Sequence, residues 1–297
     1  MNKVYLGFIA LLLVACDNNK QPSEQAFLDS LDNAKVQTPP VSKEVLGDII
    51  QSIPSPLEIS SLIKNSGVKY DKNVLNSTNN LSNYNTNYKR ALNLGIYGTD
   101  LGYANIYSQN QDALHYLDAV RTTADGLSIG QFFDFNTIRS LATNSNNLDS
   151  LLLITTTNFE KINKHLQEQE RSNLSILILT GGWLEALHLT CAVENKYPSQ
   201  TFKERIGEQK VILDQLLLLL SFYNQDANIQ SLIADLTDLQ KQFEKVEVTY
   251  TYQESTMKEV DGVLMVVDNS TKKINMTPED LKSIQAAASA IRNKIIS

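Results

Sequence analysis

Residues 174–193 read LSILILTGGWLEALHLTCAV, and this stretch decides the fold class. It is apolar on nearly every side of a helix, as is 211–223, which predicts two helices surrounded by others at the centre of a bundle. Each stretch carries an acid, Glu185 or Asp214, and each is shorter than 18 uninterrupted apolar residues. A membrane-spanning helix needs about 20 such residues, so we expect core helices here and not membrane spans.

Amphipathic helices are expected on either side of this core. The clearest pattern covers 226–245, where one apolar stripe runs at helical spacing from Ile229 to Phe243 with charged residues outside it. Comparable patterns predict helices over 84–108, 110–126, 132–144, 147–169, 172–195 and 201–223. Ser55-Pro56 predicts a further helix start, because proline suits the first position of a helix.

The period changes to that of strands near the C-terminus. Alternation of apolar and polar residues over 246–253 predicts a strand, and 263–267 followed by 273–276 predicts a β-hairpin. Thr277-Pro278-Glu279-Asp280 then has the cap, the proline and the acid of a helix start. The sequence therefore predicts a mainly α fold: a multi-helix bundle with a small β-hairpin at about 246–276 and a closing C-terminal helix.

Composition and charge narrow the class of protein. The chain has 297 residues, of which 42% are hydrophobic and 20% charged, as is typical of a globular protein and not of a disordered one. Its formal net charge of −7 argues against a nucleic-acid binder, because such proteins need a basic surface for the phosphates. Two cysteines are too few for a fold held together by disulfides.

The first sixteen residues have the pattern of an exported, lipid-anchored protein. Lys3 provides a positive charge, and the apolar stretch 4–14 is too short for a membrane span but suits a signal peptide. It ends in Leu13-Val14-Ala15-Cys16, which resembles the lipobox of bacterial lipoproteins. In that class the leader is cut before the cysteine, the thiol receives a diacylglyceryl group, and the new N-terminus is acylated, for example by palmitate.

This resemblance implies a location and a domain plan. Residues 1–15 are the expected signal peptide, 16–42 a polar tether and 43–297 a single helical domain. Lipidation of Cys16 would attach that domain to a membrane of the bacterial cell envelope, on the periplasmic side or at the cell surface. The lipobox, the helical pattern and the many asparagines together make the chain resemble helical lipoproteins of Bacteroidota-type bacteria. This resemblance implies no catalytic residues.

The best candidate site lies in the middle of the core stretch. Glycine inside a helix costs about 1 kcal/mol relative to alanine, so Gly181 and Gly182 indicate either a close helix crossing or the floor of a pocket. A carboxylate in so apolar a helix must be paired or protonated, and Arg90, Arg121 and Arg139 are the candidate partners of Glu185. A ligand-binding site here would comprise Gly181, Gly182, Trp183, Glu185 and His188, with Tyr97 and Tyr103 from the glycine- and tyrosine-rich helix 84–108.

One pattern could indicate a metal site. Glu185-x-x-His188 and Asp112-x-x-His115 have the spacing found in di-iron carboxylate bundles, although the second pair carries Asp in place of Glu. Further acids on the other helices are Asp100, Asp149 and Glu160. Paired core residues are the simpler interpretation of this pattern.

The sequence contains no nucleophile, nucleotide-binding or Cys/His metal motif. We therefore expect a non-enzymatic, lipid-anchored envelope protein that binds a protein partner or an envelope component, without a catalytic residue, cofactor or metal. The alternative is small-ligand binding, as in a sensor or uptake accessory, in a helical pocket at 181–188. A di-metal carboxylate enzyme is the third hypothesis. Cys191 is expected to be a buried core residue, although His188 nearby leaves a reactive thiol open.

Overall fold

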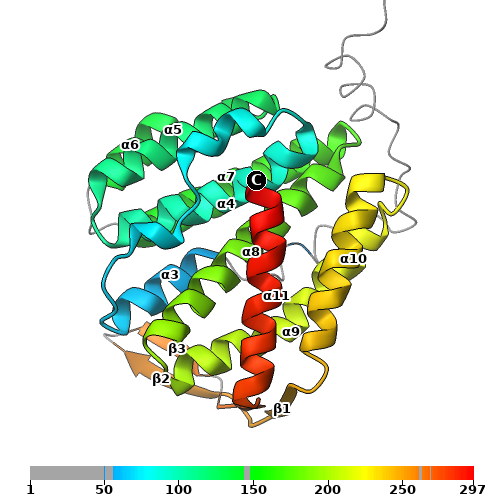
Figure 1. Ribbon diagram of the computed structural model, residues 1–297. Coiled ribbons are helices and arrows are strands. Elements are labelled where there is room, and N and C mark those ends of the chain that lie inside the picture. Colours follow the sequence, from blue (N-terminus) through cyan, green and yellow to red (C-terminus); the bar gives the residue numbers. More distant parts are fainter. Residues whose placement is uncertain (1–49, 51–55, 144–147, 261–262, 268) are drawn as a thin grey trace, which may run out of the picture. The chain divides into compact units, whose positions relative to one another are not determined.

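In the computed structural model the described residues are 50, 56–143, 148–260, 263–267 and 269–297. They form a bundle of helices, with a narrow β ribbon between the last two (Figure 1). The predicted fold class, a mainly α bundle with a small β-structure near the C-terminus and a closing helix, is confirmed. The leader, Cys16 and the tether fall outside the described residues, so these stay predictions.

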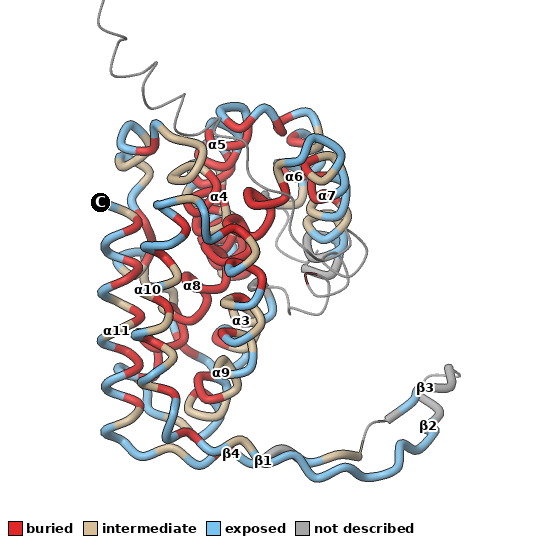
Figure 2. Tube along the Cα trace, turned by 90° about the vertical axis from the view of Figure 1, so that its right-hand side faces the viewer, coloured by how far each residue is buried: buried red, intermediate tan, exposed pale blue. Residues whose placement is uncertain are grey.

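Helix α8 (Ser172–Lys196) is the buried helix around which the others pack (Figure 2). It contacts α3 (Pro56–Asn65), α4 (Asn87–Ile106), α7 (Leu148–Glu168), α9 (Gln200–Ser221) and α11 (Pro278–Ile296). By length and composition α8 could cross a membrane, contrary to the expectation above, but 89% of its most apolar window is buried inside the described structure. Its apolar side chains therefore pack against other helices, as those of a core helix do.

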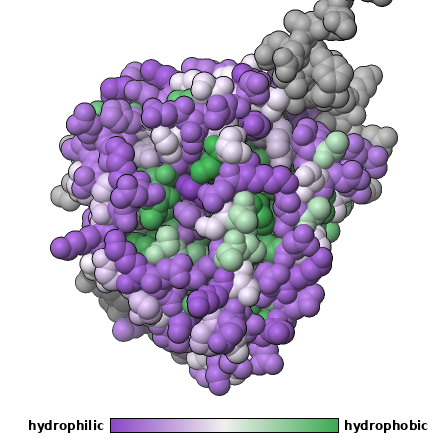
Figure 3. Space-filling view, in the orientation of Figure 1, coloured by the Kyte–Doolittle hydropathy of each residue, from purple (hydrophilic) through white to green (hydrophobic). Residues whose placement is uncertain are grey.

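The remaining helices cover this core. α5 (Asn110–Gly126) packs on α4, α6 (Phe135–Thr143) packs on α5, and α10 (Ala227–Gln242) packs on α9 and α11. The short 3-10 helices η1 (Lys72–Val74), η2 (Thr78–Asn83) and η3 (Gly130–Phe132) lie in the connections. Each helix lies within a few residues of its predicted range. The face seen in Figure 3 is mostly hydrophilic, with apolar residues showing in patches toward its middle.

Helix α9 does not lie at the centre, which corrects the interpretation of 211–223. Val211 and Leu218, seven residues apart, are each 49% exposed, whereas Leu213 and Leu220, also seven residues apart, are fully buried. One line of residues along α9 therefore packs on α8 and α10, and the opposite line faces outward. A run of leucines suits a one-sided helix as well as a central one, so only the packing decides between them.

Local hydrogen bonds set several helix ends. The hydroxyl of Thr277 accepts from the N–H of Asp280, whose carboxylate accepts from the N–H of Thr277, both at 3.1 Å, which is the predicted start of α11. The hydroxyls of Ser199 and Thr86 cap α9 and α4 in a similar way. Gly67, just after α3, has a φ of +76°, a conformation that costs glycine little.

The β ribbon, residues 247–275, has two antiparallel pairs. β1 (Glu247–Thr251) pairs with β4 (Thr271–Asn275), and β2 (Thr256–Val260) pairs with β3 (Val263–Val267). The predicted pairing of 263–267 with 273–276 is therefore wrong. The register joins Val260 to Val263, with Asp261 and Gly262 between them in the sequence, and Asp-Gly is favoured in two-residue hairpin loops. The prediction had placed the turn of the hairpin at Asp268-Asn269-Ser270 instead.

Candidate functional site

Glu185, the central residue of the predicted site, lies on α8 with none of its side chain exposed. Its two carboxylate oxygens accept hydrogen bonds from Nε and Nη2 of Arg292 on α11, both at 2.7 Å. Arg292 is only 5% exposed, so the two residues form a buried ion pair with two parallel hydrogen bonds.

The prediction that Arg90, Arg121 or Arg139 is the partner is wrong. These arginines contact other groups: Arg90 the carbonyl oxygen of Gly126, Arg121 the ring of Phe135, and Arg139 the carboxylate of Asp118. Arg292 carries a signal that could have identified it, because it lies on the buried stripe of α11. That stripe, at steps of four and three residues, comprises Leu281, Gln285, Ala288, Arg292 and Ile295.

Asp100 from α4 adds a second buried carboxyl group. Its Oδ2 accepts from the backbone N–H of Asn76 at 3.1 Å, and Oδ1 has no hydrogen-bond partner among the described residues. Complete burial, and after it the charge of Glu185, hold the pKa of Asp100 well above its usual range. We infer that Asp100 is protonated, so that two buried acids and one arginine carry no net charge. We call these three residues the Asp100–Glu185–Arg292 cluster.

The cluster binds the irregular segment that contains η1 and η2. The carbonyl oxygen of Val74 accepts from Nη2 of Arg292 and lies 3.2 Å from Nε2 of His188. Burial, and after it the charge of Arg292, lower the pKa of His188, so a neutral imidazole donates through Nε2. The carbonyl oxygen of Asn76 accepts from the hydroxyl of Tyr116 at 3.1 Å. Backbone groups of this connecting segment are thereby satisfied inside the bundle.

Gly181 and Gly182 serve a close helix crossing. A Cβ on Gly181 would overlap the carbonyl oxygen of Leu92 on α4, and one on Gly95 would overlap that of Ile178 on α8. The hydroxyl of Thr99 also donates to the carbonyl oxygen of Gly182 at 3.2 Å. The two backbones touch at this point, which is the packing interpretation of the glycine pair.

The other predicted ligand residues are also engaged with their neighbours. The indole N–H of Trp183 donates to Oε1 of Gln209 at 2.9 Å. The hydroxyl of Tyr97 donates to the carbonyl oxygen of Ser77 at 3.0 Å. Tyr103 belongs to a different group, with its ring centroid 5.4 Å from that of Tyr70. The structure thus brings Glu185 and His188 together at Arg292, while Trp183 and Tyr103 contact other groups.

The two predicted metal-binding pairs have other partners. Asp112 accepts from the hydroxyl of Tyr70 at 2.9 Å and pairs with Lys72, and His115 beside it is exposed. Within the ranges that the structure describes, no group of three or more His, Cys, Asp or Glu residues could hold a metal ion. Cys191 is buried, and burial followed by the charge of Glu194 raises the pKa of its thiol, which suits a core residue.

The geometry of the Asp100–Glu185–Arg292 cluster indicates that it stabilises the fold. It is closed to solvent, its charges are balanced, and it joins α4, α8 and α11 to the segment around Val74. A separate cavity, which no sequence pattern indicated, lies between α4, α10 and α11. Its lining residues come from three helices far apart in the chain, so no local spacing could reveal it.

Comparisons with protein-family models, with curated proteins and with solved structures find no significant match.

Proposed function

We propose that this chain is a lipid-anchored protein of the bacterial cell envelope that binds a protein partner through its β ribbon. The anchor is supported by Lys3, the apolar stretch 4–14 and the lipobox that ends at Cys16. The binding role, as opposed to a catalytic one, is supported by the interior, where Glu185 and Trp183 have hydrogen-bond partners within the chain.

The observation that carries the proposal is the exposure of apolar side chains on the ribbon. Met257 and Val266 are paired across β2 and β3 and are 73% and 69% exposed. Tyr250 and Tyr252 nearby are also exposed, and the ribbon is pale blue along most of its length in Figure 2. Two-stranded ribbons are marginally stable in water, and exposed apolar surface commonly marks an interaction site.

The occupant we infer is an extended segment of another envelope protein, added as a strand beside β3. In the part of the chain that the structure describes, β3 pairs on one side only. It is the one of the four strands without a charged residue, since β1 carries Glu247, β2 carries Lys258 and Glu259, and β4 carries Lys272 and Lys273. Charged edges discourage strand pairing, so β3 is the edge on which a partner strand meets no charge.

Photo-crosslinking in native membranes tests this proposal. A photoreactive residue at position 266 should give one discrete adduct, whereas the same residue at position 153 should give none. Leu153 on α7 is a matched control because it is 70% exposed, close to the value for Val266. Absence of an adduct at 266, or equal adducts at both positions, would contradict the proposal. An adduct of twice the chain's own mass would replace the envelope partner by a second copy.

A further inference from the structure

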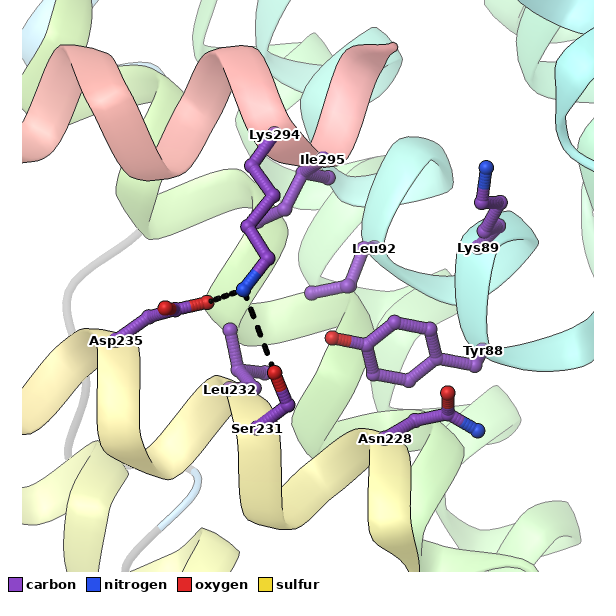
Figure 4. Close-up of a pocket in the computed structure, with 9 residues that line it drawn as sticks. All are labelled: Tyr88, Lys89, Leu92, Asn228, Ser231, Leu232, Asp235, Lys294 and Ile295. Atoms are coloured by element: carbon purple, nitrogen blue, oxygen red, sulfur yellow. Dashed lines mark hydrogen bonds and ion pairs between the residues drawn. The ribbon is translucent and has the colours of Figure 1, made fainter.

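The cavity between α4, α10 and α11 has an apolar floor. Its volume is about 180 Å³, and Leu92, Leu232 and Ile295 at its base are buried (Figure 4). An engineered protein cavity of about 150 Å³ binds benzene, so this cavity can hold one ring or a short branched chain.

Two hydrogen-bond donors converge above that floor. The ammonium group of Lys294 donates to Oδ2 of Asp235 at 2.6 Å and to Oγ of Ser231 at 3.3 Å, which leaves one of its three N–H groups. The hydroxyl of Tyr88 points into the cavity in Figure 4, and no described residue hydrogen-bonds to it. Burial, with a further contribution from Asp235, raises the pKa of Tyr88, so this group stays an O–H donor at neutral pH.

Two hydrogen-bond donors of the cavity stay available to a ligand. The carboxylate of Asp235 is already paired with Lys294, and Lys89, the other lysine of the lining, donates to the backbone oxygen of Ser297 at 3.4 Å. The polar side of the cavity therefore offers the hydroxyl of Tyr88 and the remaining N–H of Lys294. A ligand with a single acceptor group could satisfy both donors at once.

We propose that this cavity binds a small monocarboxylate whose apolar part is one ring or a short branched chain. The carboxylate accepts from Tyr88 and Lys294, and the apolar part covers the floor residues. Such a ligand would contact α4, α10 and α11 together. This inference does not depend on the β ribbon or on its partner.

Ligand-observed ¹⁹F NMR on the full chain in nanodiscs tests the proposal with three fluorophenyl probes of similar size. 4-Fluorobenzoate should bind more tightly than 4-fluorobenzamide, and 4-fluorobenzylammonium should bind most weakly. Equal binding of all three probes, or no binding of the benzoate, would overturn the proposal.

Variants place the probe in the cavity. Ser231→Phe on the rim should fill the cavity and abolish benzoate binding, whereas Ser283→Phe at an exposed position of α11 should leave it unchanged. Tyr88→Phe should weaken benzoate binding about fivefold, the typical effect of one lost hydrogen bond. Asp235→Asn should strengthen benzoate binding and weaken ammonium binding, because it removes the competing carboxylate. Thermal unfolding would verify that each variant is folded, and binding that survives Ser231→Phe would refute the assignment.

Discussion

Burial favours the protonated form of Asp100 in the folded protein more than in the unfolded chain. The carboxyl group of an unfolded aspartate has a pKa of about 3.9, and burial raises that of Asp100 well above this value. Between the two values the folded state binds more protons than the unfolded state. The free energy of unfolding therefore falls as the pH rises from about 4 toward the folded-state pKa, by up to about 1.4 kcal/mol per pH unit.

Asp100→Asn should remove this pH dependence. The amide oxygen of asparagine can accept from the N–H of Asn76, and its NH₂ group can donate toward Glu185 without a titrating proton. We expect the variant to match the parent near pH 4 and to be more stable at pH 8, as measured by urea unfolding at several pH values. Asp118→Asn, at an exposed surface position, should leave the slope unchanged. Parallel curves for the parent and Asp100→Asn would show that Asp100 does not hold the proton.

Arg292→Met should be far more damaging than the loss of a surface charge. It leaves the carboxylate of Glu185 buried without a partner, at a cost of about 3–5 kcal/mol in the free energy of unfolding. Lys294→Met on the same helix removes a partly exposed ion pair with Asp235 and should cost less than about 1 kcal/mol. Adding Glu185→Gln to Arg292→Met should recover part of the loss, because the uncompensated charge is then gone. Similar costs for the two single variants would contradict a buried, paired role for Arg292.

At the scale of elements, the crossing of α4 and α8 depends on glycine. Gly181→Ala should destabilise the fold by about 2 kcal/mol or more, because the new Cβ would overlap the backbone of Leu92 and force the helices apart. Gly98→Ala on α4 is the matched control, since a Cβ there has no atom within 4 Å. It should stabilise the protein by about 0.5–1 kcal/mol through helix propensity. Chemical denaturation measures both, and equal effects would argue against a backbone contact at Gly181.

The helices could be predicted from the sequence because their signals are local. The stripe from Ile229 to Phe243 and the cap at Thr277 each need only a few turns of chain, and both are confirmed. The need of Glu185 for a partner was also predictable, because an apolar helix gives it none. The choice of Arg292 was not, because it depends on how α11 returns to α8 over 107 residues.

The pairing of strands and the cavity show where the same reasoning stops. The pairing of Val260 with Val263 has a local sequence signal in Asp261-Gly262, but Asp268-Asn269-Ser270 is a second turn sequence close by. The cavity has no such signal, because Tyr88, Leu232 and Lys294 meet only after three helices have packed. Local patterns thus predict elements, while contacts between distant elements require the structure.

At the scale of the whole molecule, substitutions of the two cysteines test the proposed lipid anchor. The parent should incorporate labelled palmitate in its native host, and Cys16→Ser should not, because only a thiol at that position receives the diacylglyceryl group. Cys191→Ser is the matched control and should still incorporate the label, since Cys191 is buried. Intact-mass analysis of the native protein measures the same modification. An unlabelled parent, or a labelled Cys16→Ser variant, would refute the lipid anchor.

Because Glu185 precedes Arg292 in the sequence, the ribosome synthesises the acid of this ion pair well before its partner. At about 5–20 residues per second, a ribosome adds the 107 residues from 186 to 292 in roughly 5–20 s. During that delay Glu185 has no counter-ion, so α8 cannot be buried among the other helices without leaving this acid unpaired. Helix α11 therefore completes the interior, and a nascent polypeptide halted before this helix should remain open to chaperones and proteases.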